Sequence, residues 1–204
     1  GMTHGGISAN GLVFGGNISV TAPQASFSMS NTTLGSALSS TALQQGGSVN
    51  IFTQGNVTVA PINTSSAGNG GSVNVTINYG NLYLTGGGTL INASGEEGTG
   101  GKVNITFNRT RPDAGAITGN AGIVSLNGDG RILTGSRFGN AGSINISSRE
   151  GGLGSFGVAS PGRVTFQANS LFGNGGNFFA SSAGNINADW TVESNGQNGG
   201  AVFV

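Results

Sequence analysis

Apolar and polar residues alternate in short segments along most of this chain. In the segment Ser72–Ile77, the apolar residues Val73, Val75 and Ile77 alternate with polar ones. Because successive side chains of a strand point to opposite faces, this pattern predicts a β-strand with one buried and one exposed face. A Gly-Gly pair precedes the segment, and the same combination returns at 100–107. The chain is therefore a repeat.

Further copies of this module begin near residues 46, 121, 141, 161, 175, 184 and 199. A strand of about five residues cannot bury its apolar side chains alone, and a flat sheet would leave long unpaired edges. Coiling removes both difficulties if two to three strands form one coil and the coils stack at about 4.8 Å. The sequence therefore predicts an all-β fold, a parallel β-helix (β-solenoid) with short strands and corners rich in Gly and Asn.

The repeat is less regular near the amino end and in the middle of the chain. We expect an irregular N-terminal coil or cap over 1–40, followed by one continuous β-helix domain over 41–204. Terminal repeats are atypical because one face has no neighbour, so the first part is either a terminal coil or a loop packed against the stack. The long interval between Gly101 and Gly142 predicts a coil with a protruding loop or a skipped signal.

Glycine is unusually abundant and charge is scarce. The chain has 41 glycines, and we expect those at the corners to supply positive φ angles. Seven basic and seven acidic residues cancel to a net charge of zero. Such a chain has no electrostatic footprint for nucleic acid or for an anionic membrane. We therefore expect no nucleic-acid partner. No apolar run is long enough to span a membrane, so we also expect no membrane span in this segment.

One complete module resembles a known family. It reads Gly-Gly-Ser-Val-Asn-Val from Gly70, then a second strand, then a third strand ending Ile-Asn-Ala-Ser, and Gly-Thr-Gly-Gly restarts it. This resembles the repeats of filamentous-haemagglutinin-like exoproteins of two-partner secretion systems, best over about residues 46–150.

The resemblance implies a right-handed parallel β-helix that is secreted or displayed on the bacterial cell surface, with an adhesin-like structural or binding role and no cofactor. The chain would then be a segment of a longer protein whose neighbouring solenoid repeats continue the stack. Host or environmental glycans or surface proteins would be its binding partners. No secretory signal is recognisable at the amino end of the sequence.

Few residues are candidates for catalysis. His4 is the only histidine, so we expect neither a histidine-based triad nor a zinc site. A glycoside hydrolase needs two carboxylates facing one bond, whereas Glu96 and Glu97 lie in a Gly-flanked corner typical of solvated acids. A carbohydrate-active enzyme, either a polysaccharide lyase or a glycoside hydrolase, is the alternative function, which converging carboxylates in one groove would favour. A self-assembling fibre or trimeric spike is a third hypothesis.

The candidate ligand-binding residues are Arg109, Arg111, Arg131 and Trp190. Six arginines fall in the middle of the chain, several of them about one coil apart. At equal angular positions they would form a basic stripe suited to acidic glycans. We favour the interpretation that they are scattered exposed charges, as charged residues usually are.

Aromatic residues concentrate near the carboxyl end. Exposed, they would form a sugar-stacking patch or a partner surface, and buried, they would fill the interior of the coil. Burial is the default for Phe in alternating strands. The adjacent Phe178 and Phe179 must point to opposite faces if both lie in one strand, so one of them should be exposed or covered by a loop.

Overall fold

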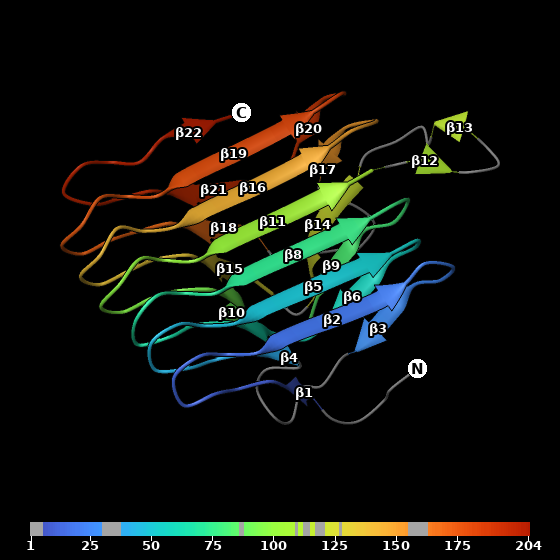
Figure 1. The fold of residues 1–204 in the computed structure, drawn as a ribbon. Coiled ribbons are helices and arrows are strands. Elements are labelled where there is room, and N and C mark those ends of the chain that lie inside the picture. Colours follow the sequence, from blue (N-terminus) through green and yellow to red (C-terminus); the bar gives the residue numbers. More distant parts are fainter. Residues whose placement is uncertain are drawn as a thin grey trace.

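The structure is a computed structural model that describes residues 6–29, 38–85, 88–108, 110–111, 115–116, 121–126, 128–154 and 163–204. In these ranges the chain forms short β-strands joined by turns (Figure 1). No helix in the described part of the chain is long and apolar enough to cross a membrane.

Three parallel sheets make up the body of the molecule. The first contains β1 (Ile7–Ser8), β4 (Leu38–Ser39), β7 (Ile62–Asn63), β10 (Gly88–Asn92), β15 (Gly130–Leu133), β18 (Val164–Gln167) and β21 (Trp190–Glu193). The second contains β2 (Asn17–Ala22), β5 (Ser48–Thr53), β8 (Ser72–Ile77), β11 (Lys102–Phe107), β16 (Ser143–Ser148), β19 (Asn177–Ser182) and β22 (Val202–Phe203). The third contains β3 (Phe27–Met29), β6 (Val57–Val59), β9 (Leu82–Leu84), β14 (Ala121–Ser125), β17 (Leu153–Gly154) and β20 (Ile186–Asn187).

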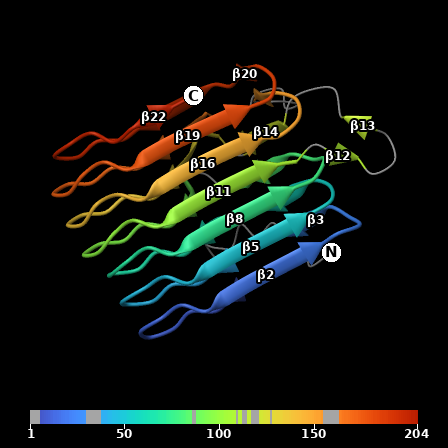
Figure 2. The same cartoon turned by 45° about the horizontal axis from the view of Figure 1, so that its top comes forward.

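The chain visits these sheets in rotation, so that each complete coil contributes one strand to each sheet. Each strand then pairs in parallel with its counterparts in the coils above and below it. The strands of the second sheet lie side by side along the whole stack (Figure 2). This arrangement is a parallel β-helix, as the sequence predicts, and its coils contain three strands, where the sequence left two or three open.

Alternation along the strands separates the core from the surface. Val73, Val75 and Ile77 of β8 are at most 1% exposed, whereas the residues between them are half-buried on the outer face. Their register partners in β11 are also apolar and buried, so identical positions of successive coils form continuous columns inside the helix. Each buried side chain of this size contributes about 1.5–3 kcal/mol relative to exposure.

An asparagine ladder keeps the outer face of the second sheet in register. The Asn74 side chain donates a hydrogen bond to Asn50 Oδ1 at 2.8 Å, and Asn104 donates to Asn74 Oδ1 at 2.7 Å. Asn145 extends the ladder by donating to Asn104 Oδ1 at 2.8 Å. These partners lie 24, 30 and 41 residues apart in sequence, so the coils differ in length while their strands remain aligned.

The longest of these coils carries the antiparallel hairpin of β12 (Thr110–Arg111) and β13 (Gly115–Ala116). The hairpin protrudes from the stack (Figure 1). The protruding loop that the sequence predicts between Gly101 and Gly142 is thus present.

The amino-terminal part contains strands that extend all three sheets. All six residues of β2 pair in register with β5, and β3 pairs with β6. β1 pairs with β4, which in turn pairs with β7. The described residues of 1–40 therefore continue the stack.

The expectation that corner glycines supply positive φ angles is wrong for the Gly-Gly pairs that precede the strands of the second sheet, such as Gly46-Gly47, Gly70-Gly71 and Gly100-Gly101. Among the described residues, positive φ occurs at Gly88, Gly128 and Gly151, with values of 85°, 91° and 74°. The pairs are required for another reason, because successive coils touch backbone to backbone at this corner. A Cβ on Gly71, for example, would lie 2.1 Å from the carbonyl oxygen of Gly47.

The late aromatic residues divide between the core and the surface. Phe178 is 1% exposed and Phe179 is 43% exposed, which confirms that the two side chains point to opposite faces. Phe166 is also buried. Phe172 and Phe203 are exposed; Phe203 lies in β22, so the default of burial in strands is wrong for it, whereas Phe172 lies outside the strands.

Candidate functional site

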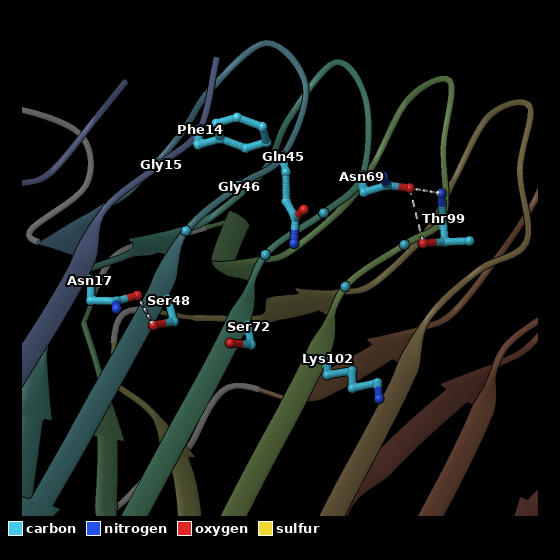
Figure 3. Close-up of a pocket in the computed structure, with 15 residues that line it drawn as sticks. Phe14, Gly15, Asn17, Gln45, Gly46, Ser48, Asn69, Ser72, Thr99 and Lys102 are labelled. Atoms are coloured by element: carbon cyan, nitrogen blue, oxygen red, sulfur yellow. Dashed lines mark hydrogen bonds between the residues drawn. The ribbon is translucent and has the colours of Figure 1, made fainter. Parts of the chain in front are cut away.

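A groove of about 640 Å³ runs along the corner between the first and second sheets and crosses four successive coils (Figure 3). We call it the corner groove. Its loop-side wall consists of Phe14, Gln45, Asn69 and Thr99. Its strand-side wall consists of Asn17, Ser48, Ser72 and Lys102. Between the walls lies a floor of glycine backbone, including the pairs Gly46-Gly47, Gly70-Gly71 and Gly100-Gly101.

The register of the coils aligns both walls. The strand-side residues open β2, β5, β8 and β11 and are register partners of one another. On the loop side, isolated parallel bridges join Phe14 to Gln45 and Gln45 to Asn69. Each coil therefore supplies one side chain to each wall, and the two are separated in sequence by two glycines.

Backbone groups at the floor are occupied by hydrogen bonds within the stack. Gly71 N donates to the carbonyl oxygen of Thr64 at 2.8 Å, and Ser72 N donates to that of Gly47 at 3.0 Å. The same pattern holds in the next coil for Gly101 and Lys102. The backbone N–H groups of the floor are therefore not free to donate to a ligand.

Some wall side chains are fixed by bonds within the protein and others are available. Asn69 Oδ1 accepts hydrogen bonds from Thr99 N at 2.8 Å and from Thr99 Oγ1 at 3.2 Å. Ser48 Oγ donates to Asn17 Oδ1 at 2.6 Å. The Gln45 amide and the Ser72 hydroxyl have no hydrogen-bond partner in the part of the chain that the structure describes.

The corner groove is polar but almost uncharged. Among the residues that the structure describes, Lys102 is the only charged one in its lining, and no Asp or Glu lines it. Paired acid and base groups for hydrolysis are therefore missing from the groove. In the described residues no group of three or more His, Cys, Asp or Glu side chains is placed to hold a metal ion. The arrangement can bind a ligand through neutral hydrogen bonds.

A second groove of about 460 Å³ lies along the corner loops that follow β10, β15 and β18, of which only the first also borders the corner groove. Its lining combines the apolar Leu133 and Leu171 with the polar Gln167 and Asn169, and it also contains no carboxylate. Arg137 lies at this groove and forms an exposed ion pair with Glu96 at 3.6 Å. An exposed pair of this kind contributes little to stability.

Of the candidate arginines, Arg131 is fully described and is not part of the corner groove. Arg131 is exposed on the outer face of the first sheet, where its register partners are Thr89 and Thr165. Arg111 belongs to β12 in the hairpin, and Arg109 lies outside the described residues. Arg131 thus has no arginine directly above or below it in the first sheet.

Trp190 begins β21 in the last coil of the first sheet and is partly buried. Its ring contacts Phe166 edge-on with 5.2 Å between centroids, and the centroid of Phe178 lies 6.4 Å away. Trp190 therefore packs against the end of the apolar core, away from the corner groove.

Sequence reasoning did not find the walls of the corner groove. Their signal in the sequence is a four-residue pattern in which two glycines are flanked by one residue on each side. It occurs at 14–17, 45–48, 69–72 and 99–102. In the sequence, the glycine pairs themselves indicate only where strands begin. The residues on either side of each pair are the ones that face the groove.

The three stacked parallel sheets define this chain as a parallel β-helix protein. Compared with models of known protein families, with curated proteins and with solved structures, it shows no match.

Proposed function

We propose that this chain is a rigid segment of a secreted or surface-displayed bacterial protein of the adhesin-like, filamentous-haemagglutinin-like type, and that it binds its partners through the corner groove. The observation that carries the proposal is the groove itself, which is formed by aligned side chains of four coils. Glycans and surface proteins are the partners proposed for it.

The groove favours binding because its walls are held in place before any ligand arrives. Backbone hydrogen bonds link each coil to the next, and the Asn69–Thr99 contact fixes the loop side. A preorganised surface loses little conformational entropy on binding, which leaves more of the contact energy as affinity. These features support the proposal of a rigid stalk that has a binding surface along one corner.

The lining supports a binding role over a catalytic one. No carboxylate lines either groove, and hydrolysis of a glycosidic bond uses a pair of them. Glu96 lies on the loops between the grooves and is paired with Arg137. These placements offer no converging pair of acids in either groove.

Blocking the corner groove should abolish adhesion. Ser72→Trp places a bulky ring in the middle of the strand-side wall, on the outer face of β8, without touching the core. We expect at least a tenfold loss of binding to polysaccharide-coated or cell-coated surfaces, measured by biolayer interferometry with the purified protein.

The matched control is Ser147→Trp, which lies on the outer face of β16 outside the groove. It should bind as the unmodified protein does, and both variants should keep its circular dichroism spectrum. Equal losses in the two variants, unchanged binding by Ser72→Trp, or release of new reducing ends from a polysaccharide would each contradict the proposal.

A further inference from the structure

We infer that the ligand of the corner groove is an uncharged polysaccharide chain that lies along the axis of the β-helix, with its successive sugars on successive coils. This inference rests on the proposed function, because it names the ligand of the same groove. It follows from the repetition, the hydrogen-bonding character and the charge of the two walls.

The two walls of the corner groove repeat from coil to coil. Each of the four coils contributes one side chain to each wall, and successive coils are stacked about 4.8 Å apart. A ligand that uses the whole groove must present similar groups at a regular interval along both of its edges. An extended polysaccharide does so, because every sugar unit carries hydroxyl groups on its edges.

The hydrogen-bonding groups of the walls match hydroxyls. The Gln45 amide and the Ser72 hydroxyl can each both donate and accept, and the Asn69 amide can donate through its NH2 group, since its oxygen already accepts two hydrogen bonds from Thr99. A sugar hydroxyl also does both. An extended peptide is less well suited, because it binds sheets by pairing with free backbone groups and the floor amides of this groove are already bonded.

The charge of the groove excludes a polyanion as the best ligand. Lys102, at one end of the strand-side wall, is the only cation in the lining. A single exposed charge is screened at moderate ionic strength and would give little affinity for a sulfated or phosphorylated chain. Neutral hydrogen bonds therefore dominate, and binding should depend only weakly on salt.

The end of the groove opposite Lys102 supplies an apolar contact. Phe14 is 65% exposed and closes the loop-side wall in the first of the four coils. Its ring can cover the C–H face of a sugar, while the amides and hydroxyls of the next coils hold the polar edges. The groove is thus directional, with an aromatic end and a cationic end.

Calorimetric titration with neutral oligosaccharides tests the inference. The probes are cello-, xylo-, malto- and chito-oligosaccharides from disaccharide to hexasaccharide. Heparin and an unstructured polar peptide are titrated separately, as representatives of the two alternative ligand classes. For one neutral series, affinity should rise with length until the chain spans the four coils and then level off. It should change less than about twofold between low and high salt, because an uncharged ligand forms no ion pair that salt could screen.

The double variant Gln45→Ala with Ser72→Ala should lower the affinity about tenfold, the order expected from two neutral hydrogen bonds. Neither side chain is hydrogen-bonded within the described protein, so the fold should be unaffected. Ser147→Ala, on the same sheet outside the groove, should bind normally.

Three results would overturn the inference: no binding of any neutral series, binding of heparin alone with strong salt dependence, or binding of the peptide alone. If one of these occurs while Ser72→Trp still abolishes adhesion, the groove remains the binding surface and only the ligand class is wrong. If Ser72→Trp leaves adhesion intact, the proposed function fails as well.

Discussion

Replacing Gly101 with Ala should destabilise the protein by about 3 kcal/mol, the upper part of the usual cost of overpacking. Gly101 has no positive φ, so the penalty arises from contact alone. A Cβ at this position would lie 1.9 Å from the carbonyl oxygen of Gly71 and 2.6 Å from that of Ala93. Both atoms belong to backbone that is hydrogen-bonded into the stack, so neither can move without separating two coils.

Gly199→Ala is the control, because Gly199 also belongs to a Gly-Gly pair but lies exposed in the last coil. The nearest atom to a Cβ there is the carbonyl oxygen of Ser194 at 3.7 Å, an ordinary contact. Its effect should stay within about 0.5 kcal/mol. Urea titration measures the free energy of unfolding of the two variants. Equal effects would show that Gly101 is not in close contact with the backbone of Gly71 and Ala93.

Replacing Ile105 with Ala should cost about 3 kcal/mol, within the range for buried aliphatic side chains truncated to Ala. Ile105 is 1% exposed and stacks between Val75 and Ile146 in a column of the second sheet. Its removal leaves a cavity in the middle of the stack, where the backbone ladders on both sides limit collapse.

Thr106→Ala is the control for Ile105→Ala, since Thr106 is the next residue and faces outward. Its substitution should change stability by about 0.5 kcal/mol or less, as is usual for surface positions. Urea unfolding of both variants measures the difference. Comparable losses at the two positions would contradict the alternation of buried and exposed faces.

The strands and their burial could be predicted because both are encoded locally. Val73, Asn74 and Val75 alternate within one segment, and a period of two fixes the faces of a strand without knowledge of its neighbours. Repetition of that segment then predicts stacking, because each copy has the same unburied face. The columns of the core follow from these two properties, whereas the number of strands per coil stayed open between two and three.

The corner groove could not be predicted in the same way, because it depends on which residues of different coils come to lie side by side. Asn69 and Thr99 are 30 residues apart and meet only through the register of the stack. The coils also differ in length, so equal spacing in sequence is a poor guide to equal position. Arg131 illustrates this, since its neighbours in the sheet are threonines.

Exposure of Phe172 was missed for a related reason. It lies in a turn between β18 and β19, where no period of two applies, and its ring stacks on Phe138 of the preceding coil at 5.4 Å. The close approach of glycine backbones was missed as well, because it too is a contact between coils.

Oxidation of paired cysteines across two coils tests the central claim, that strands of successive coils lie in parallel register. The chain contains no cysteine, so introduced pairs are unambiguous. Thr76→Cys with Thr106→Cys joins register partners on the outer faces of β8 and β11, and should form a disulfide because their Cα atoms lie about 4.8 Å apart. Thr76→Cys with Asn104→Cys is offset by two residues, at a separation on the order of 8 Å, and should stay reduced. A disulfide in the offset pair but not in the register pair would contradict the stacked-coil account.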